Sequence, residues 1–493
     1  MTRVEWLVMA MRAARKLRDV GEVRRAPRSE RTAGAPSKPP TKSNAPETRP
    51  EPPLVPSSVE GPNHGPRGTP PALGPEADGP QPTTPEADEP EPTRTQPPIP
   101  LEKIDRDAID VVRRLRRSGY QAYLVGGCVR DLLIGLEPKD FDVSTNAKPE
   151  EIRRTFRNCR IVGRRFRLAH VYFRGGKVIE TSTFRASATE AGEGEADLLI
   201  RHDNVFGTER QDALRRDFTI NALFYDVSTG TVVDHVGGLV DLEHRQLRMI
   251  GDPEIRLRED PVRIIRAVRI AAKTEFEIEE TLSDAMDRHK ADIHRCPKPR
   301  VSEEILKLFR SGHAEASYRG LERTNVLGVV LPRYAKEVSS RDTILAYLAA
   351  LDARVARGGA SDTLVLAALA APFIPDRPAP KELFEGLEAL AVDLGATRRA
   401  TESLRHMFLA QRHFSGGRIR KGRATPPEAL ARRGYFLDAL DLFELRTVVA
   451  GGSLEEIESW RSTARLVSRN DDEESASDIS EPPGRPRRRR RRR

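Results

Sequence analysis

A glycine pair followed by two closely spaced aspartates constrains this chain more than any other feature. Gly126 and Gly127 follow the apolar run 121–125, and glycine lets the backbone turn so that its N–H groups can meet an anion. Asp140 and Asp142 stand two residues apart, so in a strand both side chains lie on one face. Mg²⁺ usually combines one or two carboxylates with substrate phosphates. The order of these parts predicts a site that binds a nucleoside triphosphate and transfers its nucleotide.

The N-terminal fifth of the chain does not have the composition of a folded domain. Of 38 prolines, 22 lie in residues 27–100, where aromatic residues are scarce and Pro-Glu-Ala-Asp occurs twice. Such a segment cannot bury enough apolar surface to offset its ordering entropy. We expect residues 1–100 to be a disordered arm, and a true start downstream of Met1 is a second interpretation of its beginning.

Hydrophobic periodicity predicts an α+β fold with a small mixed α/β head followed by an all-helical remainder. Apolar residues at helical spacing indicate a helix at 105–118. Short apolar runs next to glycine indicate strands at 121–125, 141–144, 168–173 and 177–184. The predicted domains are a disordered arm (1–100), a catalytic head (101–246), a helical neck (247–310), a helical body (311–467) and a disordered tail (468–493).

The cysteines indicate a reducing compartment. Cys128, Cys159 and Cys296 are odd in number and widely spaced, which argues against a disulfide framework and against a structural zinc site. No apolar run is long enough to span a membrane. We therefore expect a cytoplasmic monomer that carries free thiols.

Five motifs follow one another through residues 101–309. They are Leu124–Asp131, Lys139–Val143, Arg215–Ala222, Arg258–Arg263 and Pro299–Glu303. In this order they resemble the motifs of the class II nucleotidyltransferases, which are the bacterial poly(A) polymerases and CCA-adding enzymes of the polymerase β superfamily. The resemblance implies template-independent transfer of nucleotides to RNA 3′ ends, with a nucleotidyltransferase head, a neck that recognises the nucleobase and a body that contacts RNA.

The segment 163–171 favours one branch of this family. With Arg164, Arg165 and Arg167 it resembles the basic stretch of poly(A) polymerases, whereas CCA-adding enzymes tend to be shorter and less basic here. We predict a polynucleotide adenylyltransferase that uses ATP in RNA polyadenylation and turnover, and expect these arginines to bind RNA. The alternatives are a CCA-adding tRNA nucleotidyltransferase and, for the arginines alone, an ordinary solvated strand edge.

Carboxylates are the candidate catalytic groups. Phosphoryl transfer needs positioning and charge neutralisation more than covalent help, and two Mg²⁺ ions bound by Asp140 and Asp142 would supply both. Glu180 is an acid among β-branched residues and is the third candidate. Its alternative is an edge-strand acid that faces solvent.

The motifs also suggest roles in nucleotide binding. Gly126, Gly127 and Arg130 would cradle the triphosphate, although Arg130 could instead form an ion pair with Asp131 or Asp142. The candidate clamp for ribose and phosphates consists of Arg216, Asp217 and Asn221.

By analogy with the family, Glu259, Asp260 and Arg263 would read the adenine base. Residues 259 and 263 are i and i+4 on one helix and share a face; the alternative is a plain salt bridge at a helix start. Arg266 and Arg269 would continue a basic stripe toward the RNA.

Two other classes are disfavoured. A kinase or P-loop ATPase would need a Gly-x-x-x-x-Gly-Lys-Ser/Thr run, which the sequence lacks. A non-catalytic RNA-binding protein would keep basic patches without Asp140 and Asp142. The proline-rich arm and the tail are candidate contacts for RNA-decay partners.

The C-terminus carries a dense run of positive charge. Arg487–Arg493 supply seven charges of the formal net +9, and such a segment attracts RNA phosphates regardless of sequence. The alternative is a tail that folds back on the acidic residues 471–474.

Deleting residues 485–493 should leave thermal stability and the rate at saturating RNA unchanged. RNA affinity should fall, and the slope of log affinity against log salt should become shallower by about 0.7 for each lost phosphate contact with single-stranded RNA. A salt titration of both proteins on one short oligonucleotide measures this. Identical slopes would exclude the tail as an RNA contact.

Overall fold

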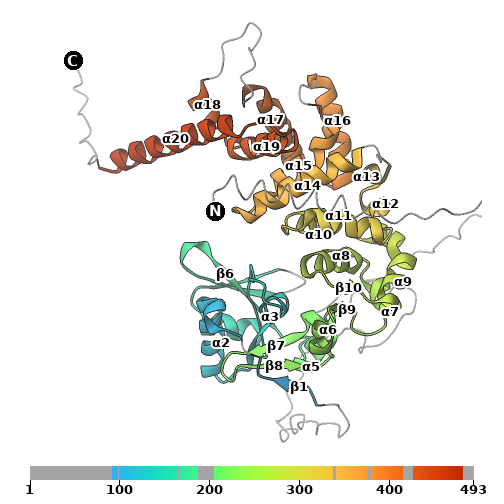
Figure 1. The fold of residues 1–493 in the computed structure, drawn as a ribbon. Helices are drawn as coiled ribbons and strands as arrows, with labels where there is room; N and C mark the ends of the chain where they lie inside the picture. Colours follow the sequence, from blue (N-terminus) through green and yellow to red (C-terminus); the bar gives the residue numbers. More distant parts are fainter. Residues whose placement is uncertain are drawn as a thin grey trace, which may run out of the picture. The chain divides into compact units, whose positions relative to one another are not determined.

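The computed structural model describes residues 91–480, apart from residues 98, 164–166, 187–204, 337–339, 376–378 and 415–425, and of residues 468–480 it describes only the backbone. A mixed sheet with helices occupies the first part, and helices occupy the rest (Figure 1). The predicted α+β class is confirmed. The arm before residue 91, Arg164, Arg165 and the poly-Arg tail lie outside the described residues.

Eight strands form one sheet in the order β1-β8-β7-β2-β3-β6-β5-β4. The pair β3 and β6 is parallel, and the other neighbours are antiparallel. The strands are β1 (Thr93–Thr95), β2 (Ala122–Val125), β3 (Asp142–Thr145), β4 (Cys159–Val162), β5 (Leu168–Tyr172), β6 (Val178–Thr183), β7 (Leu223–Asp226) and β8 (Thr231–Asp234).

Helix α2 (Arg106–Arg117) anchors one face of the sheet. The Asp105 carboxylate caps it by accepting hydrogen bonds from the backbone N–H groups of Asp107 and Ala108. Its buried residues share a core with the strands and with α3 (Gly127–Leu133) and α4 (Pro149–Thr155). The apolar spacing therefore predicts this helix to within a residue at each end.

The turn between β2 and α3 depends on glycine. Gly126 has φ +79°, a left-handed conformation that costs other residues energy. The turn brings the start of α3 close to Asp142, the first residue of β3. The predicted glycine turn and its neighbouring strand are both confirmed.

Helices dominate after β8. The remaining helices of the head and neck are α5 (Glu209–Leu214), α6 (Gly238–Glu243), α7 (Pro253–Glu259), α8 (Arg263–Thr274), α9 (Glu280–His289) and α10 (Lys298–Phe309). The body contains α11 (Ala314–Arg323), α12 (Leu327–Val330), α13 (Pro332–Lys336), α14 (Arg341–Ala356), α15 (Asp362–Ala370), α16 (Pro380–Leu394), α17 (Arg398–Phe414), α18 (Pro427–Ala431), α19 (Phe436–Val449) and α20 (Glu455–Ser480).

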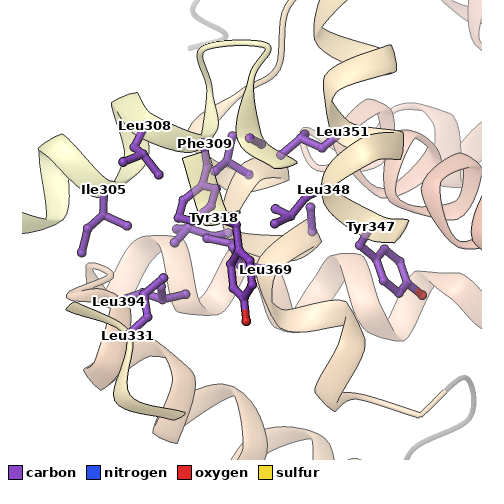
Figure 2. Close-up of a cluster of buried hydrophobic side chains, with 14 of the residues drawn as sticks. Ile305, Leu308, Phe309, Tyr318, Leu331, Tyr347, Leu348, Leu351, Leu369 and Leu394 are labelled. Carbon is purple, nitrogen blue, oxygen red and sulfur yellow. The ribbon is translucent and has the colours of Figure 1, made fainter. Parts of the chain in front are cut away.

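One continuous core joins neck and body. Phe309, Tyr318, Leu348 and Leu369 come from four different helices and are buried together (Figure 2). Burying an aliphatic or phenylalanine side chain contributes about 2 kcal/mol. Packing of this kind, rather than helix propensity, fixes the neck helices that reach the site described below.

Three predicted limits of order and secondary structure need correction. Strand β1 lies inside the predicted arm and pairs with β8, so ordered chain begins before residue 101. The short strands β9 (Gln246–Leu247) and β10 (Glu277–Ile278) pair inside the region predicted to be helical. Helix α20 continues to Ser480, past the predicted limit at residue 467, because nothing in the acidic stretch breaks a helix.

The thiols of Cys128, Cys159 and Cys296 are free and buried, as predicted. None of the described helices combines the length and the apolar character needed to cross a membrane.

Candidate active site

A cleft of about 340 Å³ lies where the glycine turn, the motif after α5 and the neck helices meet. Polar side chains dominate its lining. The lining residues are Gly126, Gly127, Asp142, Arg215, Arg216, Asp217, Asn221, Asp260, Arg263, Arg266, Arg300 and Glu304. All of them except Arg215, Arg300 and Glu304 are site residues predicted from the sequence, so the fold brings together motifs that are far apart in the chain.

The two candidate catalytic carboxylates stand at the start of β3, which begins at Asp142 and follows Asp140 by two residues. Phe141 and Val143 are buried, whereas Asp140 and Asp142 are exposed, which is the alternation of a strand with one solvated face. Asp142 stands beside Glu180 in the parallel register of β3 and β6. Asp140 and Glu180 are not among the residues that line the cleft; they lie beside it.

The pKa of the Asp142 carboxylate is raised. Partial desolvation in the cleft and the neighbouring charges of Glu180 and Asp140 raise its pKa to about 6, against the opposing effect of Arg216. Its side chain still reaches solvent through the open cleft. A carboxylate with like charges around it is electrostatically ready for a cation.

Arg216 brings a positive charge next to the glycine turn. Its guanidinium donates to the buried Asp212 carboxylate at 2.9 Å and lies 5.3 Å from the centre of the Phe224 ring. A Cβ placed on Gly126 would lie 3.4 Å from Arg216 Nη1. The turn therefore brings backbone and a guanidinium together, which suits a phosphate.

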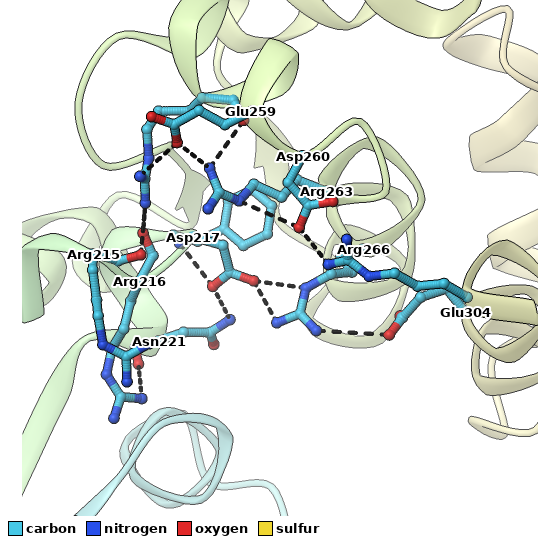
Figure 3. A network of polar contacts seen from close by, with 12 residues as sticks. Arg215, Arg216, Asp217, Asn221, Glu259, Asp260, Arg263, Arg266 and Glu304 are labelled. Atoms are coloured by element: carbon cyan, nitrogen blue, oxygen red, sulfur yellow. Dashed lines mark hydrogen bonds and ion pairs between the residues drawn. The ribbon is translucent and has the colours of Figure 1, made fainter. Parts of the chain in front are cut away.

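Asp217 is the buried centre of the cleft wall (Figure 3). One carboxylate oxygen accepts from the backbone N–H of Phe218 at 2.9 Å and from Asn221 at 3.4 Å, and the other accepts from Arg266 Nε at 2.8 Å. Burial alone would raise the pKa of Asp217, but Arg266, with help from Arg263, holds it well below its usual range. The carboxylate joins the head to helix α8, so its internal partners occupy the oxygens expected to meet a ribose.

Arg256 on α7 fixes the backbone of the same motif. Its guanidinium donates to the carbonyl oxygens of Arg215 at 2.6 Å and Arg216 at 2.8 Å, and to Glu259 at 2.9 Å. Glu259 also accepts from Arg263 at 3.3 Å. Glu259 is thus a buried support behind the cleft and not part of its lining.

Asp260 is an acidic group of the neck that reaches the cleft. Its Oδ2 accepts from Arg300 at 2.6 Å, while its Oδ1 is buried without a hydrogen-bond partner in the described structure. Buried polar atoms are nearly always satisfied, so this oxygen is available to accept a hydrogen bond from a molecule in the cleft.

The neck helix predicted to carry residues 259 and 263 is interrupted. Helix α7 ends at Glu259 and α8 begins at Arg263, because Pro261 disfavours the helical conformation at Asp260 and lacks an N–H donor. The i,i+4 pair still forms across the break.

Several arginines with predicted binding roles have protein partners in the structure. Arg130 is buried and donates to Asp131 and to Asn221, so the ion-pair alternative forms, while its role at the triphosphate stays a prediction. Arg266 and Arg269, expected to continue a basic stripe toward the RNA, are half-buried and both lie against Glu304. Arg167, expected to bind RNA, pairs with Glu150 at 2.6 Å.

The sequence patterns assign no role to four residues of the site: Arg215, Arg256, Arg300 and Glu304. Arg215 and Arg300 stand inside recognised motifs, so the motifs offer a signal for them. Arg256 and Glu304 act through partners far away in the chain, which no local pattern reveals.

Comparisons with known proteins agree with this architecture. Family models match at residues 122–248 ("Poly A polymerase head domain"), 275–337 ("Probable RNA and SrmB- binding site of polymerase A") and 385–493 ("Polymerase A arginine-rich C-terminus").

Three relatives define the family. Poly(A) polymerase I of Salmonella typhimurium is 47% identical over 48% of this chain, and that match spans 52% of the relative, about half its length. Poly(A) polymerase I of Haemophilus influenzae is 36% identical over 72% of this chain and 83% of its own. A CCA-adding enzyme of Levilactobacillus brevis is 31% identical over 60% of this chain and 72% of its own. The chain belongs to the family of bacterial poly(A) polymerases and CCA-adding enzymes.

The buried charge of Asp217 generates a prediction about stability. Asp217→Asn should lower the free energy of unfolding by about 3 kcal/mol at pH 7, because it removes the nearer of the two carboxylates that pair with Arg266 and leaves only the more distant Glu304. The native pKa is depressed, so the carboxylate stabilises the fold above its unfolded pKa of about 3.9 and this stabilisation is lost as the pH falls below it. The difference in the free energy of unfolding between wild type and Asp217→Asn should therefore be smaller at pH 3 than at pH 7.

Urea unfolding at both pH values measures the effect. The exposed Asp110→Asn on α2 is the matched control and should change little. Equal stability of wild type and Asp217→Asn at pH 7 would contradict the account.

Proposed function

We propose that this chain transfers AMP from ATP to RNA 3′ ends without a template. The observation that carries the proposal is the cleft, which unites the glycine turn, Asp142, Arg216 and the neck residue Asp260 around one space. The relatives named poly(A) polymerase I support adenylation as the activity. RNA and ATP as partners, and a cytoplasmic location, follow from the same proposal.

The carboxylates fit a divalent metal. Asp142 has a raised pKa beside Glu180 and Asp140, and a bound cation would relieve this repulsion. The described residues hold no preformed group of three or more metal-ligating side chains. Asp140 and Asp142 would therefore share Mg²⁺ with triphosphate oxygens, and the metal would supply charge neutralisation and a more acidic RNA 3′-hydroxyl.

The chain's own residues position the nucleotide. Arg216 and the backbone N–H groups at Gly126 and Gly127 would hold the triphosphate. Asn221, which lines the cleft, would face the ribose. Two further groups act behind them by fixing the backbone of the motif: Asp217 and Arg256.

Base selection is assigned to the neck. The unpaired Oδ1 of Asp260 would accept from the amino group of adenine, and Arg263 beside it would supply donors. Arg300 holds the other oxygen of Asp260 and so sets the direction of the acceptor.

CCA addition is the second candidate, because a CCA-adding relative also matches 60% of this chain. The higher identity to poly(A) polymerase I favours adenylation.

Asp142→Asn should abolish nucleotide incorporation and leave RNA binding nearly unchanged, since the lost charge serves the metal. Primer extension and filter binding on the same RNA measure the two properties. The exposed Asp110→Asn should behave like wild type. Substantial incorporation by Asp142→Asn in Mg²⁺ would refute the metal assignment.

Arg263→Ala and the isosteric Asp260→Asn should each reduce the preference for ATP over the other nucleotides by about tenfold or more, because a polar partner of the base is lost. Competition between labelled nucleotides gives the ratio. Arg258→Ala, an exposed arginine on α7, is the control. An unchanged preference in both variants would place base selection elsewhere.

A further inference from the structure

A row of polar residues leads from the candidate catalytic carboxylate to the edge of the sheet. Asp142 on β3 is the register partner of Glu180 on β6. Glu180 is the partner of His170 on β5, and His170 is the partner of Arg160 on β4. Register partners present their side chains on one face of a sheet. The row therefore crosses four neighbouring strands on a single face.

This face is accessible. The alternate residues of β4 and β5, which are Cys159, Ala169 and Val171, are buried in the core on the opposite face. Side chains along the row reach solvent: Arg160 and Glu180 are exposed, and His170 and Tyr172 are half-buried. The row is a solvated surface and not part of the packing.

The far end of the row combines aromatic rings with a positive charge. The guanidinium of Arg160 lies 5.8 Å from the centre of the Tyr172 ring, and the centres of the His170 and Tyr172 rings are 6.4 Å apart. Arg160 has no ion-pair partner among the residues described. Aromatic faces for stacking beside an exposed cation are how proteins hold single-stranded nucleic acid.

We propose that Arg160, His170 and Tyr172 form a track for the nucleotides just upstream of the RNA 3′ end. This inference rests on the proposed function. Three strand spacings of about 4.8 Å place Arg160 roughly 14 Å from Asp142, a length of about four stacked nucleotides at roughly 3.4 Å each.

Charge gives the track a direction. Glu180 and Asp142 repel backbone phosphates, whereas Arg160 attracts them. A strand of RNA that lies along the row with an upstream phosphate at Arg160 brings its 3′-hydroxyl to the carboxylates. The occupant is RNA because the row is continuous with the site that must receive an RNA 3′ end.

The test compares Arg160→Ala, Arg160→Lys and Tyr172→Leu with a control away from the row. The control is Arg154→Ala, an exposed arginine on α4. Extension of a short oligoadenylate gives KM for RNA, KM for ATP and the rate at saturation. Loss of Arg160 should raise KM for RNA several-fold and make its salt dependence shallower by about 0.7 in slope. Tyr172→Leu should raise KM for RNA by about tenfold.

In Arg160→Ala and Tyr172→Leu, KM for ATP and the saturated rate should stay at the control values, and Arg160→Lys should recover the salt slope. A primer with 4-thiouridine near its 3′ end should crosslink to β5. If KM for RNA and its salt dependence in Arg160→Ala and Tyr172→Leu equal those of Arg154→Ala, the track is wrong while the proposed function stands. If wild type extends no RNA, the proposed function itself fails.

Discussion

The buried carboxylate of Asp217 is the interaction on which the site depends. It joins a motif of the head to helix α8 through Arg266, and it is held by the Phe218 N–H and by Asn221. A buried charge is tolerated only when it is fully paired, and removing one partner leaves an uncompensated charge. Head and neck are therefore fixed together at the place where the cleft forms.

The two walls of the cleft have different proposed roles, one in the chemistry and the other in base selection. The strand side presents Asp142 and the glycine turn, and the neck side presents Asp260 and Arg263. Arg256 links them, because it binds the backbone of the head motif and Glu259 of the neck. The proposed chemistry and base selection are thus held in one geometry by ion pairs that are themselves shielded from water.

Features with local causes can be predicted from the sequence. The alternation of exposed Asp140 and Asp142 with buried Phe141 and Val143 follows from the period of a strand, and the turn at Gly126 follows from the freedom of glycine to adopt a positive φ. The break in the neck helix is equally local in origin, since the proline that causes it stands in the motif.

Long-range pairing sets the limit of such prediction. Arg130 is buried against Asn221 and Arg269 is half-buried against Glu304, and both partners lie far away in the chain. An arginine in a motif gives no sign of whether it binds ligand or protein, because both partners offer it the same oxygen acceptors.

The composition of the product tests the central claim most directly. The purified chain is incubated with Mg²⁺, all four nucleotides and a mixture of tRNA lacking its end and unrelated RNA, and the new 3′ ends are sequenced. Runs of adenosine are expected on both substrates. Addition of only C, C and A to tRNA, or no addition to either RNA, would contradict this claim.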